Sequence, residues 1–199
     1  MKILKEYEAE MFLKKSGLPI IRHKLITSEK ELIKAAESFG YPIVLKNPSE
    51  LHKTEKNAVI LNVYRENLIS SYKKLKAKKV LVQKQLDGLQ LLIGIKKDPT
   101  FSHILVFGSG GIYTEILKDV SFRVLPLKNK DIKEMISETK ISKLLDYRNN
   151  KIDAEKLVSI LLKISNLVKK YKKIRELDIN PLIANNREIV VADARIIFE

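Results

Sequence analysis

The sequence predicts an α+β protein of two lobes with a cleft where they meet. Helix and strand patterns alternate in the first half of the chain, whereas short strands, then helices, then a final pair of strands follow in the second half. The 199 residues are 45% hydrophobic, which is enough to bury a sizeable core. We expect an N-terminal lobe over residues 1–82 and a C-terminal lobe over residues 83–199.

Capping and helix-ending residues delimit the helices of the first lobe. Apolar residues at helical spacing predict a first helix that Gly17 ends. Ser28 with Glu31 forms a capping-box pattern, which opens a second helix that ends at Gly40. The remaining elements, in order, are a buried strand over 42–45, a strand over 58–64, a helix over 66–76 and a strand over 80–82.

The second lobe begins as a series of strands. Asp153 is the expected N-cap of a helix whose apolar residues recur at helical spacing from Leu157 to Val168. The chain then closes with two strands around Asn185-Asn186. The predicted strands cover residues 89–96, 103–107, 111–117, 121–126, 174–184 and 188–197.

The composition excludes several classes of protein. Cysteine is absent, which excludes disulfide scaffolds, cysteine zinc sites and thiol catalysis. No run of 18 apolar residues occurs, and the N-terminus turns acidic before an apolar stretch forms. We therefore expect no membrane span, no signal peptide and a cytoplasmic location.

The net charge is +14, with 38 lysines and arginines against 24 acidic residues. Only seven of the cationic residues are arginines, and the lysine pairs are scattered over different segments. Reading of DNA bases relies on the bidentate arginine fork, so this composition argues against a sequence-reading role. A solvated lysine-rich surface explains the charge, although a field that attracts anionic substrates is the alternative. We expect neither a nucleic-acid nor a membrane partner.

The final hairpin carries the most informative polar residues. A two-residue Asn185-Asn186 turn would place residue 180 opposite 191 and residue 178 opposite 193. Because side chains alternate along a strand, Asp178, Asn180 and Asp193 would share one face. Facing carboxylates repel each other unless a cation lies between them, and oxygen ligands suit Mg²⁺. An exposed edge hairpin, or a salt bridge to Arg195, is the alternative.

Other polar residues are weaker candidates when taken alone. Lys46 ends a buried strand, where an ammonium group could neutralise phosphate oxygens or could simply reach solvent. His52 lies in a polar loop beside a lysine, so it would be neutral and able to accept a phosphoryl group, although most loop histidines have no such role. The charged segment from Glu115 to Arg123 indicates either a functional surface or structural salt bridges.

Eight short motifs, in order, resemble a known family. The order of the motifs makes the resemblance specific, and the resemblance covers residues 3–197. The motifs are Leu45-Lys46, Leu51-His52-Lys53-Thr54, Val82-Gln83-Lys84, Leu92-Ile93-Gly94, the glycine-rich run from Val106 to Glu115, Lys118-Asp119-Val120-Ser121-Phe122-Arg123, Glu176-Leu177-Asp178-Ile179-Asn180-Pro181-Leu182 and Val191-Ala192-Asp193-Ala194-Arg195. The chain resembles the ATP-grasp β subunit of ADP-forming acetyl-CoA (acyl-CoA) synthetases, which are related to succinyl-CoA synthetase.

The resemblance implies a two-lobed ATP-grasp fold with the nucleotide, ATP or ADP, held between the lobes together with Mg²⁺. The family enzyme converts acyl-CoA, ADP and phosphate into acid, CoA and ATP through phosphohistidine. By the same resemblance, Lys46 meets the nucleotide phosphates and His52 takes the phosphoryl group. Asn180 and Asp193 hold Mg²⁺ with Asp178 nearby. The adenine pocket is lined by the connector Val82, Gln83, Lys84, Gln85 and Leu86.

The family's CoA-binding part and principal phosphohistidine lie in an α part that these residues do not supply. A separate CoA-binding α subunit is therefore implied, and an α2β2 assembly is the family expectation.

Two departures from the family pattern favour a second hypothesis. Asn57-Ala58 replaces a glycine pair in the phosphate loop, which adds side chains where the backbone would approach phosphate. Gln90 stands where glutamate is usual. The alternative function is a non-catalytic assembly or regulatory subunit of the same fold.

Overall fold

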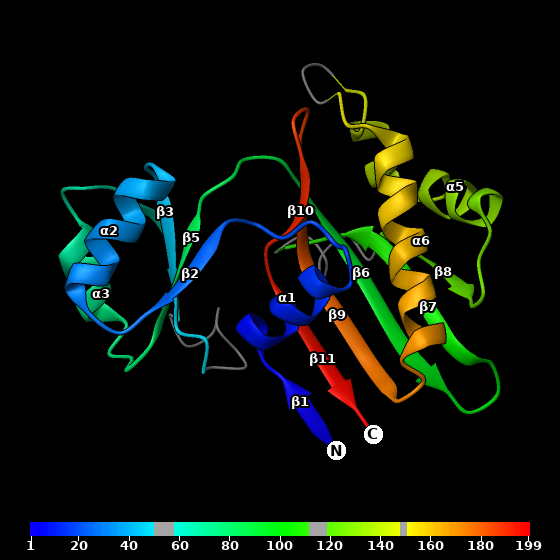
Figure 1. Cartoon of the computed structure of the whole chain (residues 1–199). Coiled ribbons are helices and arrows are strands. Elements are labelled where there is room, and N and C mark those ends of the chain that lie inside the picture. The colour runs from blue at the N-terminus through cyan, green and yellow to red at the C-terminus, as the bar shows by residue number, and fades with distance from the viewer. Residues whose placement is uncertain (50–57, 112–118, 148–150) are drawn as a thin grey trace. The chain divides into compact units, whose positions relative to one another are not determined.

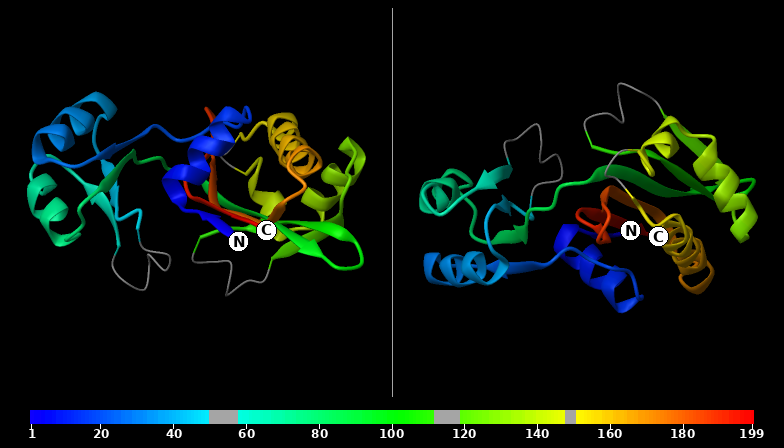
Figure 2. Two further views of the ribbon diagram at one scale, coloured as in Figure 1. Left: turned by 60° about the horizontal axis from the view of Figure 1, so that its bottom comes forward. Right: turned by 90° about the horizontal axis from the view of Figure 1, so that it is seen from above.

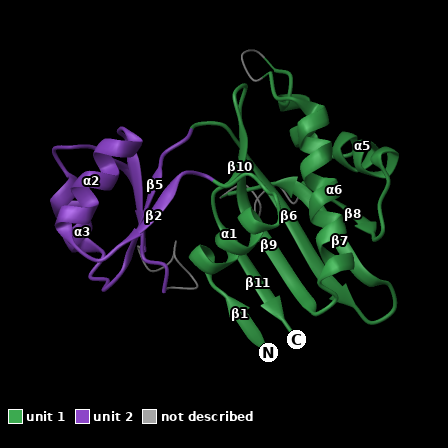
Figure 3. Cartoon of the chain, in the orientation of Figure 1, with its two compact units in different colours: residues 1–20, 87–199 green, residues 21–86 purple. Residues whose placement is uncertain are grey.

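The structure is a computed structural model that describes residues 1–49, 58–111, 119–147 and 151–199 (Figure 1). The chain forms two compact units (Figure 3). The smaller unit comprises residues 21–86, and the larger unit comprises residues 1–20 and 87–199. Among the helices that the structure describes, none is long and apolar enough to cross a membrane.

The smaller unit is a four-stranded antiparallel sheet in the order β2-β5-β3-β4. One face of it packs against helices, because Leu32, Ala35 and Leu68 join a buried cluster with Ile43 and Val82. The elements are β2 (His23–Ile26), α2 (Glu29–Phe39), β3 (Ile43–Lys46), β4 (Val59–Val63), α3 (Leu68–Lys74) and β5 (Val80–Lys84).

The larger unit is built on a seven-stranded sheet in the order β1-β11-β9-β6-β7-β8, with β10 paired to β9. Its strands are β1 (Lys2–Leu4), β6 (Leu89–Asp98), β7 (Ser102–Ser109), β8 (Val120–Val124), β9 (Ile174–Ala184), β10 (Ile189–Val191) and β11 (Ala194–Phe198). Its helices are α1 (Glu6–Lys15), α5 (Asn129–Ser137), the 3-10 helix η1 (Lys140–Leu144) and α6 (Ala154–Lys170).

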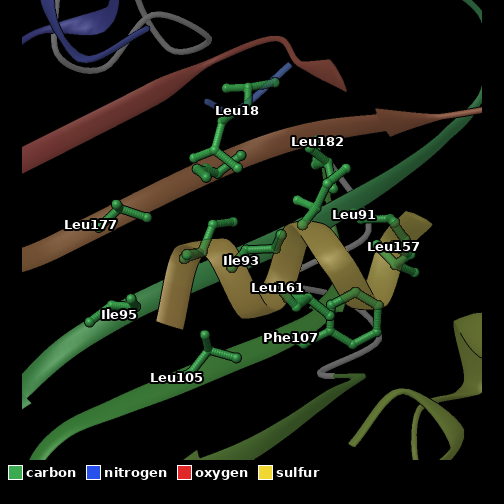
Figure 4. Packing of buried hydrophobic residues seen from close by; sticks show 14 of the residues in the cluster. Leu18, Leu91, Ile93, Ile95, Leu105, Phe107, Leu157, Leu161, Leu177 and Leu182 are labelled. Atoms are coloured by element: carbon green, nitrogen blue, oxygen red, sulfur yellow. The ribbon is translucent and has the colours of Figure 1, made fainter. Parts of the chain in front are cut away.

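The helices that the structure describes cover one face of this larger sheet. In Figure 2, α1, α5 and α6 lie on the same side of it. Figure 4 shows Leu157 and Leu161 of α6 beside Phe107, within one large buried cluster. Burial alternates along β6, where Leu91, Ile93 and Ile95 face this core. Residues at the alternate positions lie on the opposite face, which none of the described helices covers and which we call the helix-free face.

The two helix caps predicted from sequence are confirmed. Ser28 Oγ accepts a hydrogen bond from the Glu31 N–H at 3.3 Å, and Asp153 Oδ1 accepts one from the Lys156 N–H at 3.0 Å. The Glu31 carboxylate also accepts a hydrogen bond from the backbone N–H of Thr27 at 2.7 Å.

The division into units differs from the two lobes expected at residues 1–82 and 83–199. Residues 1–20 belong to the larger unit, because Ile3 of β1 pairs with Ile197 of β11 and because Ala9 and Leu13 of α1 enter the larger core. Residues 83–86 belong to the smaller unit, since Lys84 continues strand β5.

Candidate functional site

The final hairpin has a different register from the one predicted. Its turn spans residues 185–188, because Asn185 N–H donates to Glu188 O at 3.0 Å and Asn185 Oδ1 accepts from the N–H groups of Arg187 and Glu188, each at 2.9 Å. The longer turn makes Ala184 the partner of Ile189. The predicted pairing of 180 with 191 and of 178 with 193 is therefore wrong by two residues.

The corrected register still brings the three predicted metal-site residues to the helix-free face. Asp178 of β9 lies opposite Arg195 of β11 in the strand register. The backbone N–H of Asn180 donates to Asp193 O at 3.2 Å. Their neighbours Ile179 and Ala194 are buried in the core on the opposite face. A shift of two residues changes a side chain's partner and leaves its face unchanged.

Burial and neighbouring charges shift the pKa of the Asp178 carboxyl. Burial raises the pKa of the Asp178 carboxyl, and the charges of Asp193 and Glu176 raise this pKa further. The Arg195 guanidinium opposes the rise, yet the pKa of Asp178 stays above its ordinary value. A divalent cation would reduce this repulsion between carboxylates.

Asn180 is oriented by the glycine-rich turn that follows β7. Its Oδ1 accepts a hydrogen bond from the Gly111 N–H at 2.8 Å. A backbone N–H only donates, so this contact identifies which amide atom of Asn180 is the oxygen. That oxygen keeps a second lone pair, which a metal ion can use.

The glycines of this turn are required by close backbone packing. Gly110 N–H donates to Gln90 O at 2.8 Å, and a Cβ at Gly110 would lie 2.6 Å from the backbone carbon of Leu91. Gly111 has a φ of +64°, where side chains are rarely tolerated, and a Cβ there would collide with the Gln90 side chain. Gln90 therefore lies against the turn that holds Asn180.

A buried carboxylate, that of Asp119, fixes the start of the same turn. It accepts hydrogen bonds from Ser109 Oγ at 2.8 Å, Lys140 N–H at 2.6 Å and Ile141 N–H at 2.8 Å. Burial alone would raise the pKa of Asp119, but these hydrogen bonds outweigh burial and hold the pKa below its ordinary value. The sequence reveals Asp119 only as part of a motif and does not reveal these partners.

Arg123 points to the helix-covered side of the sheet and joins β8 to the end of α5. Its Nη1 donates to Glu138 Oε2 at 2.9 Å and to Ser121 Oγ at 3.2 Å. The hydrogen bonds from Arg123 and Ser121 lower the pKa of Glu138 to about 2. This geometry matches the structural salt bridge that sequence analysis left open for Arg123.

Lys46 lies on the face of the smaller sheet away from α2 and α3. It pairs with Leu81, and the neighbouring Val44 pairs with Gln83. Lys46 is only 6% exposed and Gln83 only 1%, so both polar side chains lie in a protected environment. Val82, by contrast, packs in the smaller core, which leaves its backbone as the part that could meet a ligand.

The rest of the predicted connector is more open. Lys84 is exposed and Leu86 is half-buried. Gln85 holds β4 through Asn62, because its Oε1 accepts from the Asn62 N–H at 2.8 Å and its Nε2 donates to Asn62 Oδ1 at 2.7 Å. The predicted residues His52 and Glu115 lie outside the described residues, as does Asn57.

The donor set on the helix-free face fits a magnesium ion. Asn180, Asp193 and Asp178 offer one amide oxygen and two carboxylates, and Mg²⁺ takes few protein carboxylates because phosphate oxygens and waters complete its shell. In the described part of the chain, no three His, Cys, Asp or Glu side chains form a metal-binding group. Two carboxylates and one amide oxygen leave coordination positions that phosphate oxygens and waters could fill.

Comparisons with known proteins show the family of the chain. An ATP-grasp domain model matches residues 1–198. The "Acetate--CoA ligase [ADP-forming] II subunit beta" of Pyrococcus furiosus is 39% identical, over 98% of this chain and 91% of its own. The "Acetate--CoA ligase [ADP-forming] II" of Archaeoglobus fulgidus is 38% identical over 98% of this chain, which spans only 30% of that longer protein.

Solved structures give the same result. The acetyl-coenzyme A synthetase 1 of Ca. Korarchaeum cryptofilum, in complex with coenzyme A and Ca-AMPCP, matches with a TM-score of 0.90 and 34% identity, over 100% of this chain and 94% of that chain. A Pyrococcus horikoshii protein matches with a TM-score of 0.88 and 36% identity, over 99% of this chain and 92% of its own. The chain therefore belongs to the ATP-grasp family of ADP-forming acetate–CoA ligase β subunits.

Proposed function

We propose that this chain is the nucleotide-binding β subunit of an ADP-forming acyl-CoA synthetase, which converts acyl-CoA, ADP and phosphate into acid, CoA and ATP. The observation that carries the proposal is the meeting of Asn180 with Asp193 on the helix-free face, where Gly111 orients the amide of Asn180. Asn180 and Asp193 belong to the motifs that the chain shares with the family. The match covers 91% of each of two relatives that are named as β subunits of such ligases.

The larger unit supplies the metal side of the site. Asn180 and Asp193 would hold Mg²⁺ through their side-chain oxygens, with Asp178 nearby. An ion held by these residues would neutralise charge on the nucleotide phosphates. Positioning and electrostatics contribute most of the catalysis of phosphoryl transfer. A related synthetase has been solved with Mg-AMPPCP, which supports magnesium as the cation.

The smaller unit supplies positive charge and the base pocket. Lys46 would contact phosphate oxygens, since a protected ammonium interacts more strongly with phosphate than a solvated one. The connector from Val82 to Leu86 would line the adenine. His52 would carry the phosphoryl group between the nucleotide and the partner.

A separate α subunit completes the reaction in this proposal. The Archaeoglobus fulgidus relative is more than three times as long as the matched region, whereas the Pyrococcus furiosus relatives are β subunits of similar length. The α subunit would bind CoA and the acyl group and would carry the principal phosphohistidine. An α2β2 stoichiometry and a cytoplasmic location are part of the proposal.

Calorimetric titration of the whole chain with ADP, with and without Mg²⁺, tests the proposal. We expect saturable binding that Mg²⁺ strengthens at least tenfold. The double variant Asn57→Gly/Ala58→Gly is the matched comparison, because it restores the glycine pair of the phosphate loop. If neither protein binds ADP with Mg²⁺, the proposed function is wrong. Binding by the double variant alone would instead favour the non-catalytic alternative.

A further inference from the structure

Three successive backbone N–H groups at the end of β7 donate to three different parts of the larger unit. The hydrogen bonds run from Ser109 N–H to Asp119 O at 3.0 Å, from Gly110 N–H to Gln90 O at 2.8 Å, and from Gly111 N–H to Asn180 Oδ1 at 2.8 Å. Because peptide units are planar, the first two contacts restrict the direction of the third N–H. The N–H that orients Asn180 therefore depends on what holds Ser109 and Gly110.

Asp119 holds Ser109 through its side chain as well as its backbone. Ser109 Oγ donates to Asp119 Oδ2 at 2.8 Å. Asp119 is only 7% exposed and Ser109 only 4%, so solvent competes little for this hydrogen bond. The two backbones also approach closely, because a Cβ on Gly108 would collide with Asp119 O. The end of β7 is thus fixed against Asp119 by three separate contacts.

The same carboxylate is held by the start of η1. Lys140 N–H donates to Asp119 Oδ1 at 2.6 Å, and Ile141 N–H donates to Asp119 Oδ2 at 2.8 Å. The first N–H groups of a helix need an acceptor outside that helix, and Asp119 supplies it. Ile141 itself is buried in the larger core. Asp119 therefore connects the core to the turn that contacts Asn180 on the helix-free face.

We propose that Asp119 is a positioning residue for the metal site, where it acts through Ser109 and the glycine turn to orient the Asn180 amide. The inference rests on the proposed function, in which Asn180 is a ligand of the cation. Mg²⁺ demands near-ideal octahedral geometry, so its ligands must be held within about 0.5 Å of their productive positions. Loss of the Asp119 carboxylate would let the turn shift and would weaken cation binding, although every ligand side chain remains.

Titrations of the full-length chain with Mn²⁺ in the presence of ADP, followed by electron paramagnetic resonance, test this proposal. Asp119→Ala removes the carboxylate, and Ser109→Ala removes only the hydroxyl that joins it to the turn. Ile164→Ala is the control, because it truncates a fully buried side chain of α6 that takes no part in these hydrogen bonds. Each substitution is also made in an Asn180→Ala background, which completes a double-mutant cycle. Thermal melts of all the proteins report their stability.

Residues that orient metal ligands typically change metal affinity about 10–100-fold when they are substituted, so Asp119→Ala should weaken Mn²⁺ binding about tenfold. Ser109→Ala should weaken it at least twofold. Ile164→Ala should lower the melting temperature yet change Mn²⁺ affinity by less than twofold. In the Asn180→Ala background, Asp119→Ala should cause less than a twofold further loss, because its effect passes through Asn180.

The inference is overturned if Asp119→Ala binds Mn²⁺ like the wild type, if Ile164→Ala loses as much affinity as Asp119→Ala, or if the losses from Asp119→Ala and Asn180→Ala multiply. Should Asp119→Ala fail to fold, Ser109→Ala decides by the same three criteria. Any of these results with a wild type that binds Mn²⁺ leaves the proposed function standing. A wild type that binds no Mn²⁺ in the presence of ADP would overturn the proposed function and this inference with it.

Discussion

The backbone N–H of Gly111 donates to Asn180 Oδ1 at 2.8 Å, across 69 residues of sequence. The contact joins the turn after β7 to the strand that carries the predicted metal ligand. Glycine suits position 111 because its φ of +64° disfavours other residues and because a Cβ there would strike the Gln90 side chain. The turn thus positions a residue that the sequence predicts to be a metal ligand.

Removing the acceptor at Asn180 should destabilise the protein. Asn180→Ala leaves the half-buried Gly111 N–H without this partner, so we expect a loss of about 1 kcal/mol in the free energy of unfolding. Asn180→Asp keeps an oxygen acceptor and is the matched control. Urea unfolding measures both, and equal stability of Asn180→Ala and the wild type would contradict the positioning role.

Asp119 should contribute strongly to stability, although in the sequence it is only one of several charged residues in its segment. Asp119→Ala leaves the donors Ser109 Oγ, Lys140 N–H and Ile141 N–H without their acceptor. We expect a cost of about 1–3 kcal/mol for each donor that finds no water. Because the pKa of Asp119 is lowered on folding, its contribution is present above the unfolded pKa and is lost as the pH falls through the folded value. Thermal melts of the variant should therefore show a weaker pH dependence between pH 6 and pH 2.5 than those of the wild type.

Glu138 should also make the stability of the folded protein depend on pH in the acidic range. Its pKa falls from an ordinary 4.5 to about 2 in the folded protein, through Arg123 and Ser121. The stabilisation is therefore complete above pH 4.5 and disappears as the pH falls toward 2. Melting temperatures of Glu138→Gln should depend less on pH in this window than those of the wild type. Glu155→Gln is the control on an exposed lysine pair, and a similar change in both variants would argue against a special role for Glu138.

The larger core should depend on α6. Leu161 is fully buried in it, so Leu161→Ala should lower the free energy of unfolding by about 2–5 kcal/mol. Ser159 lies on the exposed side of the same helix, and Ser159→Ala should change stability by less than about 0.5 kcal/mol. Equal effects of the two variants in denaturant unfolding would contradict the packing that Figure 4 shows.

Local patterns were sufficient to predict most elements and the face that carries the site. The alternation of side chains placed Asp178, Asn180 and Asp193 together even though the predicted register was wrong, because an error of two residues preserves the face. The register itself depended on the Asn185 side chain, which accepts from two backbone N–H groups and lengthens the turn.

Long-range partners could not be predicted from the sequence. Three residues of β1 join the far end of the chain through β11, and nothing in Lys2–Leu4 indicates that partner. Glu138 is likewise 15 residues from Arg123, and only the packing of α5 on the sheet brings the two together. Sequence reasoning therefore grouped residues 1–20 with residues 21–82, whereas the structure groups them with the larger unit, and it left the role of Arg123 open.

The central claim is that Asn180 and Asp193 hold a divalent cation together with the nucleotide. Electron paramagnetic resonance with Mn²⁺ in place of Mg²⁺ tests it most directly, because the free-ion signal falls as Mn²⁺ binds. In the presence of ADP, the wild type and the control Arg123→Lys should bind one Mn²⁺ per chain, whereas Asp193→Ala should lose at least tenfold in affinity. Undiminished Mn²⁺ binding by Asp193→Ala in the presence of ADP would contradict the account.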